Sequence, residues 1–236
     1  MKTSLPCIVF LLLTSVANSQ SISGSELLEK AIDFHDPNEK WSTFSSAFKV
    51  TMQTPNSSER LSIIRLDIPR QSFVLEVSKD DDSYAFIVEG DSCKVSLNGK
   101  TELTEDQKAK HRLNEERGFM YRDYYTYLYG LPMKLKDAGT LIDPIVKTKE
   151  FKGKKYLVLQ VDYDARVGED RWYFYFDPQT YAMKVYQFYH DESKNDGEYI
   201  LLSGLEEIGG IKMPKTRAWY YNKDDNYLGT DILTPN

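Results

Sequence analysis

Residues able to act as acids, bases or metal ligands gather most densely in one short segment of the C-terminal half. His190, Asp191 and Glu192 follow one another, with Asp196 close behind. Oxygen and nitrogen atoms at this spacing could hold a cation or supply a general base. A calcium-binding loop, however, would have glycine and glutamate where this chain has Asp196 and Leu202. The pattern therefore favours a solvated hairpin turn, and an envelope hydrolase built on the first three residues is the weakest functional hypothesis.

The rest of the sequence contains no motif typical of catalysis or cofactor binding. Neither the GxGxxG nor the GxxxxGK[ST] nucleotide pattern occurs, and metalloprotease, esterase and CxxC signatures are also missing. His35, His111 and His190 are the only histidines, and their spacing does not preassemble a metal site. We therefore predict no catalytic residue, no metal and no cofactor, in a protein that is not an enzyme.

Composition sets the class of protein and excludes one class of partner. The chain has 236 residues, of which 41% are hydrophobic and 28% charged, which is typical of a globular protein. Its 30 Lys and Arg are outnumbered by 36 Asp and Glu, for a formal net charge of −6. Such a balance provides no basic field for a nucleic-acid backbone, so we expect no nucleic-acid partner. The length suits a single all-β domain.

Residues 1–19 have the pattern of a secretory signal peptide. Lys2 precedes an apolar run over Leu5–Val16, which is too short to span a bilayer stably. Ala17-Asn18-Ser19 then supplies small residues where a signal peptidase cuts. Cleavage near Ser19/Gln20 would leave residues 20–236 as a soluble exported protein, periplasmic or extracellular.

Cleavage would also leave the protein without any possible intramolecular disulfide. It removes Cys7, and Cys93 is then the only cysteine. Because Cys93 is in phase with Val95 and Leu97, we predict a small buried hydrophobic residue and not a reactive thiol. Burial of apolar surface must therefore stabilise the fold.

The mature chain opens with a predicted amphipathic helix. Ser23-Gly24-Ser25-Glu26 has the spacing of a capping box, and the helix should end by Asp36 because Pro37 disfavours helical geometry before it. His35 at that end is interpreted as a cation that compensates the helix dipole.

Alternating apolar residues then predict a meander of five antiparallel strands. Phe48, Val50 and Met52 mark the first strand. In the second, the alternation moves from Ile63 to Ile64, which predicts a β-bulge. Later apolar positions are Phe73, Leu75, Val77, Tyr84, Phe86 and Val88, and the meander ends at the turn Asn98-Gly99.

A helical insertion is expected at about 104–130. Thr104 and Gln107 form a second capping box, and Gly130 followed by Pro132 supplies a stop. The second helix of this insertion is aromatic around nearly its whole circumference and therefore needs a covering surface. Its candidate lid residues are Met120, Tyr121, Tyr124, Tyr125, Tyr127 and Leu128.

Seven more strands are predicted after the insertion, for a total of about twelve. The strand Arg171 to Phe176 is apolar on both faces: Trp172, Phe174 and Phe176 point one way, and two tyrosines point the other way. This strand is therefore either central between two layers, as in an ordinary sandwich core, or the wall of a hydrophobic hollow.

The order of helix, five-strand meander, helical insertion and second meander behind a signal peptide resembles the periplasmic lipoprotein carriers of the LolA/LolB type. The strand-turn-strand Tyr175-Phe176-Asp177-Pro178-Gln179-Thr180-Tyr181 is similar to a hairpin of that superfamily. Further segments resemble an exported family from Bacteroidota without assigned activity: Ser25 to Pro37, Tyr124 to Leu135, Tyr173 to Tyr189, Asn195 to Ile200 and Gly210 to Leu233.

The resemblance implies a mainly β (α+β) fold in which a curved antiparallel sheet forms an incomplete barrel. Residues 20–236 would be a single half-barrel domain with an N-terminal helix and a helical lid between the two meanders. Its concave side would hold acyl chains under the lid. No lid-contacting arginine or receptor contact of a known carrier can be matched to a position in this chain.

We therefore predict an exported, monomeric carrier or binding protein for a lipid, an acyl chain, an acylated protein or another hydrophobic ligand, with transient membrane contact. The alternative is a non-catalytic interaction module in envelope assembly, with a solid interior and a tyrosine-rich surface. The predicted ligand-binding residues are Phe48, Val50, Met52, Phe73, Leu75, Phe86, Trp172, Phe174 and Trp219.

Overall fold

The computed structural model describes residues 22–236, so the predicted signal peptide and its cleavage point lie outside the described residues. The helices are α1 (Gly24–His35), α2 (Glu105–His111) and α3 (Glu115–Gly130), with single 3-10 turns η1 (Trp41–Thr43), η2 (Met133–Lys136) and η3 (Glu192–Lys194). The strands are β1 (Ser45–Thr54), β2 (Ser57–Asp67), β3 (Ser72–Lys79), β4 (Asp82–Glu89), β5 (Ser92–Leu97), β6 (Thr140–Ile142), β7 (Lys147–Phe151), β8 (Lys154–Tyr163), β9 (Arg171–Phe176), β10 (Met183–Tyr189), β11 (Glu198–Ile208), β12 (Ile211–Tyr221) and β13 (Tyr227–Pro235).

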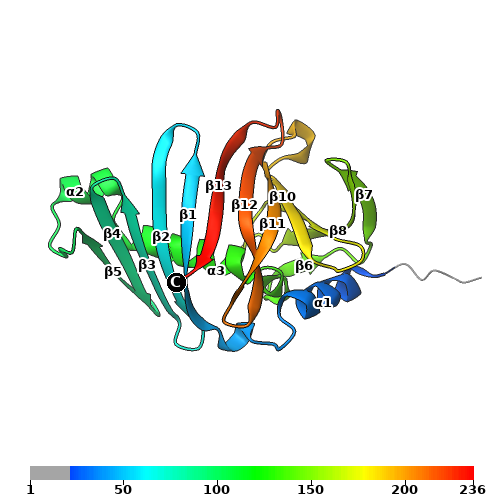
Figure 1. The fold of residues 1–236 in the computed structure, drawn as a ribbon, viewed down its shortest axis with the longest axis horizontal. Helices are drawn as coiled ribbons and strands as arrows, with labels where there is room; N and C mark the ends of the chain where they lie inside the picture. The colour runs from blue at the N-terminus through cyan, green and yellow to red at the C-terminus, as the bar shows by residue number, and fades with distance from the viewer. Residues whose placement is uncertain (1–21) are drawn as a thin grey trace, which may run out of the picture.

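All of these strands belong to one antiparallel sheet. Its order is β5-β4-β3-β2-β1-β13-β12-β11-β10-β9-β8-β6, and β7 pairs with the other half of β8. The sheet is strongly curved but its two edges do not meet, and α3 runs along one of its faces (Figure 1). The predicted fold, an incomplete antiparallel barrel with an N-terminal helix and helices inserted between two meanders, is confirmed.

The individual strands agree with the sequence periods except in two places. The short strand β6 was not predicted. The predicted bulge in β2 is wrong, because β2 pairs with β3 in unbroken register from Leu61 to Asp67. Ser62 is the reason: it is fully buried on the same face as Ile64 and Leu66, and a polar residue at an inward position disguised the alternation.

Strand β9 lies between two apolar layers from Tyr173 to Phe176, whereas Trp172 near its start is only partly buried. Phe174 and Phe176 are buried in the main core on the face that meets α3. Tyr173 and Tyr175 belong to a second, smaller cluster on the opposite face. There Phe151 of β7 covers Tyr175, with ring centroids 5.2 Å apart.

Helix α1 begins at the predicted capping box, in which Ser23 and Glu26 bond each other's backbone. The interpretation of His35 as a dipole-compensating cation is wrong, because this side chain is fully buried. Its Nε2 accepts the Met183 N–H at 3.0 Å, so its Nδ1 carries the proton and donates to the Lys212 carbonyl at 2.6 Å. The neutral ring thereby joins α1 to β10 and β12.

Helix α3 lies directly on the sheet because small residues occur where it touches its neighbours. A Cβ atom at Gly118 would overlap Cys93 Sγ on β5, and one at Gly130 would overlap the Trp41 ring. The prediction that Cys93 is a buried hydrophobic residue is confirmed. No helix within residues 22–236 has the length and apolarity to cross a bilayer.

We expect acid to destabilise the fold through His35. Burial lowers the pKa of His35 to about 4, below its ordinary 6.5, so the unfolded chain binds this proton more tightly than the folded one. Lowering the pH from 7 to 4.5 should therefore reduce the free energy of unfolding by roughly 2–3 kcal/mol through this group. Over the same pH interval, the free energy of unfolding of His35→Gln should fall by that amount less than the free energy of unfolding of the wild type, as measured by urea unfolding.

His190→Gln is the matched control. His190 is exposed, and its hydrogen bond to Asp170 raises its pKa, so acid does not remove stability through this ring. An acid-induced loss that is the same in the wild type and in His35→Gln would contradict the prediction.

Gly118→Ala should destabilise the protein although alanine favours helices. The new methyl group would overlap Cys93 Sγ and approach Phe86 Cδ1 at 3.2 Å, so α3 must move off β5. We expect a loss of about 1–3 kcal/mol in the free energy of unfolding. Cys93→Ala removes the overlapping sulfur atom, so Gly118→Ala should cost less stability in a Cys93→Ala background than in the wild type. If the losses of the two single variants simply add in the double variant, this packing is wrong.

Candidate functional site

A groove of about 720 Å³ lies along the face of α3 that does not pack on the sheet. Its floor is α3, one wall is the turn between β2 and β3, and the other wall is formed by the segment before β6 together with β8 and β9. The lining residues are Leu66, Asp67, Ile68, Gln71, Ser72, Phe73, Arg122, Asp123, Tyr124, Thr126, Tyr127, Lys134, Asp137, Ala138, Thr140, Tyr163, Val167, Gly168, Asp170 and Trp172.

Aromatic contacts hold the wall formed by β8 and β9 in place. The hydroxyl groups of Tyr127 and Tyr163 share a hydrogen bond, which ties α3 to β8. The Tyr127 ring meets the edge of Trp172 at 5.7 Å, and Trp172 stacks on Phe188 at 4.8 Å. Because each ring is supported from behind, this wall presents a firm apolar surface to the groove.

Charged side chains surround this apolar surface. Arg122 pairs with the neighbouring Asp123 at 2.8 Å, and Lys134 pairs with Asp137. Asp67 and Asp170 stand at opposite walls. An apolar wall with a charged rim suits a ligand that is apolar along its length and polar at an end.

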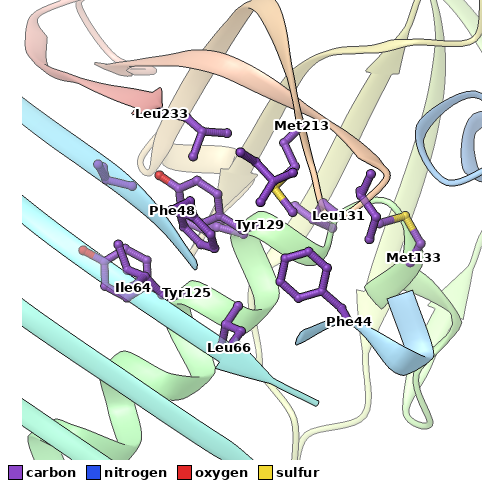
Figure 2. Packing of buried hydrophobic residues seen from close by; sticks show 14 of the residues in the cluster. Phe44, Phe48, Ile64, Leu66, Tyr125, Tyr129, Leu131, Met133, Met213 and Leu233 are labelled. Atoms are coloured by element: carbon purple, nitrogen blue, oxygen red, sulfur yellow. The ribbon is translucent and has the colours of Figure 1, made fainter. Parts of the chain in front are cut away.

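The space on the other side of α3 is filled by the protein's own rings. Three tyrosines of α3 pack onto three phenylalanines of the first meander: Tyr129 on Phe48 at 4.8 Å, Tyr125 on Phe73 at 6.2 Å and Tyr121 on Phe86 at 5.4 Å. Figure 2 shows Phe48 and Tyr129 next to each other in this core, with their rings tilted by 32°. The helix therefore occupies much of the concavity of the sheet, and the groove runs along its outer face.

This arrangement divides the predicted ligand-binding and lid residues into separate environments. Those that line the groove are Phe73, Trp172, Tyr124 and Tyr127. Those buried in the core are Phe48, Val50, Leu75, Phe86, Phe174, Tyr125 and Leu128. The others are partly exposed elsewhere: Met52, Trp219, Tyr121 and, beside α2, Met120. As ligand contacts, these assignments stay a prediction.

The sequence analysis missed a set of charged residues on the inward face of the sheet. In cross-strand register, Arg60 of β2 is opposite Met52, Met52 is opposite Asp231, and Asp231 is opposite Arg217. We call Arg60, Asp231 and Arg217 the inward polar row. The sequence pattern could have indicated two of them, because Arg217 is in phase with the apolar positions of β12 and Asp231 is in phase with those of β13.

Each member of the inward polar row has a neutral contact. The Arg217 guanidinium, only 1% exposed, lies 3.9 Å from the centroid of the Tyr129 ring and donates to the Pro214 carbonyl at 2.9 Å. Asp231 accepts the indole N–H of Trp219 at 3.2 Å. Arg60 donates to the Tyr125 hydroxyl at 3.5 Å. The row therefore lies between the sheet and α3, with Arg217 and Asp231 buried and Arg60 partly exposed.

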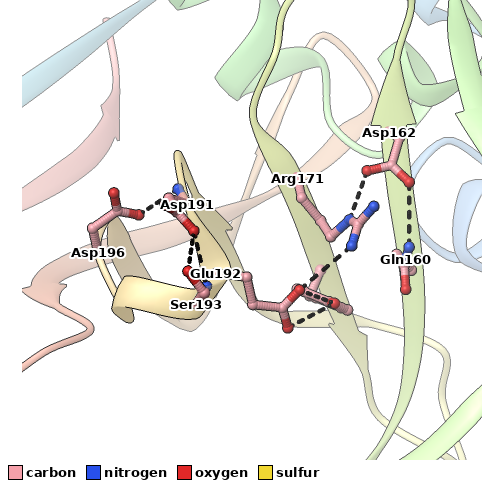
Figure 3. Close-up of polar contacts among 8 residues, drawn as sticks. Gln160, Asp162, Arg171, Asp191, Glu192, Ser193 and Asp196 are labelled. Atoms are coloured by element: carbon pink, nitrogen blue, oxygen red, sulfur yellow. Dashed lines mark hydrogen bonds and ion pairs between the residues drawn. The ribbon is translucent and has the colours of Figure 1, made fainter.

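The structure does not bring the acid–base candidates of the 190–196 segment together. His190 bonds Asp170 at 2.6 Å. Asp191 pairs with Lys194 at 2.7 Å and accepts from Ser193, which lowers its pKa to about 2. Glu192 instead accepts from the Tyr173 hydroxyl at 3.0 Å and pairs with Arg171 at 3.6 Å, and Figure 3 shows the pair with Arg171. These three side chains serve separate local contacts, and the described residues contain no cluster of three or more potential metal ligands.

Comparison with known proteins agrees with the fold. A family model described as a family of unknown function, DUF6503, matches residues 5–236. A LolA superfamily protein from Nitrosomonas europaea is 11% identical, with a TM-score of 0.54 over 91% of this chain and 92% of that chain. An outer membrane lipoprotein-sorting protein domain from Vibrio parahaemolyticus is 13% identical over 89% of each chain, with a TM-score of 0.48. No curated protein matches. The first of these structural likenesses confirms a LolA-like fold.

Proposed function

The chain belongs to the family of unknown function DUF6503, and from its geometry we propose a soluble, exported carrier or binding protein for a lipid, an acyl chain or another hydrophobic ligand of the cell envelope. The observation that carries this proposal is the groove of about 720 Å³ along α3. Ligand pockets have volumes of roughly 300–1,000 Å³, so the groove is large enough for one acyl chain or a comparable molecule.

Ligand binding would be driven by burial of the aromatic surface that the groove exposes to water. Trp172 and Tyr127 turn apolar surface toward the groove, and Phe73 lies beneath it with 1% of its surface exposed. Covering such surface gains about 25 cal/mol per Å². An apolar chain laid along α3 would gain this energy, while the charged rim keeps the open groove compatible with water.

We propose in addition that this carrier is exported and is not an enzyme. Residues 1–19 would direct the chain out of the cytoplasm, with cleavage near Ser19/Gln20 and a periplasmic or extracellular destination. The LolA-like half-barrel supports a carrier role, because its open side leaves α3 accessible to a chain drawn from a membrane or from an acylated protein. The mature protein would act as a monomer in transient contact with a membrane.

Filling the groove should abolish ligand uptake without unfolding the protein. Ala138 lines the groove and is exposed, so Ala138→Trp places an indole where the ligand would lie. We expect the dissociation constant for a fluorescent fatty acid to rise about tenfold or more, equivalent to at least ~1.4 kcal/mol of lost contact. Native mass spectrometry of the purified mature protein should show bound apolar molecules in the wild type only.

Ala85→Trp is the control, because Ala85 lies on the face of β4 opposite the buried Phe86 and far from the groove lining. It should bind as the wild type does. A wild-type protein that purifies empty and takes up no fatty acid would refute the carrier proposal and favour an interaction module instead.

A further inference from the structure

The inward polar row carries more positive than negative charge. It contains two guanidinium groups and one carboxylate, and no ion pair within 4.0 Å joins either arginine to an acid in the part of the chain that the structure describes. Burial raises the pKa of Asp231, which weakens its ability to offset the arginines. Asp231 attracts both arginines but carries one charge against two, so a further negative group would stabilise this region.

The same region contains unsatisfied hydrogen-bonding atoms. Within residues 22–236, the buried side-chain atoms without a partner are Arg60 Nε, Ser62 Oγ, Tyr129 OH, Tyr186 OH and Arg217 Nε. The two guanidinium Nε atoms can only donate, and each hydroxyl can donate as well. All five belong to the inward polar row or to side chains next to it, so one acceptor-rich group could satisfy several of them.

Tyr124 and Tyr186 connect this region to the groove. Tyr124 lines the groove with 37% of its surface exposed, and the surrounding protein and nearby Asp231 raise the pKa of its hydroxyl well above the ordinary value. The Tyr186 ring packs against Trp172 of the groove wall at 6.1 Å and against Trp219, the partner of Asp231, at 6.2 Å. Tyr124 and Tyr186 therefore lie between the groove and the row.

We propose that the inward polar row is the subsite for an anionic head group, a carboxylate or a phosphate, of an amphiphile whose apolar tail lies in the groove along α3. This inference rests on the proposed carrier function and names its ligand class. Water could accept the same hydrogen bonds but would leave the guanidinium charges unbalanced, whereas an anion supplies acceptor atoms and opposite charge together.

Equal-length ligands with different heads test the inference. The assay measures displacement of 1-aminoanthracene, a neutral fluorophore, from the full mature protein by palmitate, hexadecyl phosphate or hexadecanol. Inorganic phosphate is the control for an anionic group that carries no alkyl chain. We expect the two anions to bind about tenfold or more tightly than hexadecanol, since a hydrogen bond to a charged group is worth that much. The tighter of the two anions identifies the head group, and inorganic phosphate alone should displace nothing.

Substitutions in the row should change this preference in opposite directions. Arg217→Met and Arg60→Met should each reduce the affinity for the anions about tenfold while hexadecanol binds unchanged. Asp231→Asn removes the competing negative charge and should strengthen anion binding, an effect that a purely structural role would not produce. Arg65→Met is the control, because Arg65 is exposed and pairs with Glu76 at 3.1 Å on the other face.

The outcomes separate this inference from the carrier proposal. Thermal melting shows which variants fold. If Arg217→Met does not fold, Arg60→Met and Asp231→Asn are enough to test the inference. Equal affinity for palmitate and hexadecanol in the wild type, or weaker anion binding by Asp231→Asn, overturns the head-group subsite and leaves the carrier standing. Failure of every alkyl ligand to displace the fluorophore overturns both.

Discussion

The packing of α3 against the first meander is the contact on which the rest of the structure depends. Tyr121, Tyr125 and Tyr129 recur at every fourth position, so they form one aromatic column whose adjacent rings lie 6.2 and 5.9 Å apart. That column fills the curvature of the sheet, and Gly118 lets the helix approach closely enough to do so. Because these rings fill much of the concavity, the groove runs along the other side of α3.

The same contact explains why charged groups are enclosed in an otherwise apolar interior. Once Tyr129 is seated, its ring lies against Arg217, and the Tyr125 hydroxyl reaches Arg60. Cation–π contact and single hydrogen bonds to neutral groups only partly replace the hydration that these guanidinium groups lose. The helix thus stabilises the core through its rings and at the same time leaves unsatisfied polar atoms beneath it.

The second meander contributes a firm wall because its central strand is packed on both faces. Tyr173 and Tyr175 are covered by their own small cluster, with Lys149 4.6 Å above the Tyr173 ring. On the inward face, Trp172 is held by Phe188 and Tyr127. Support on both sides fixes the position of the indole that lines the groove, and this preorganisation reduces the entropy that a ligand would otherwise lose in ordering it.

The sequence by itself determined the local elements: the capping boxes of α1 and α2, the alternation of most strands, the burial of Cys93 and the half-barrel order of helices and meanders. These features depend on neighbouring residues and on which side of a strand a residue faces. The tertiary structure alone decided that Phe48 and Phe86 belong to the core while Tyr127 and Trp172 reach the groove, because periodicity does not tell what packs on an apolar face. It also decided the orientation of α3, whose aromatic circumference favoured no single side. The alignment of Arg60, Asp231 and Arg217 likewise comes from the pairing of β1 with β13, two strands that are distant in the chain.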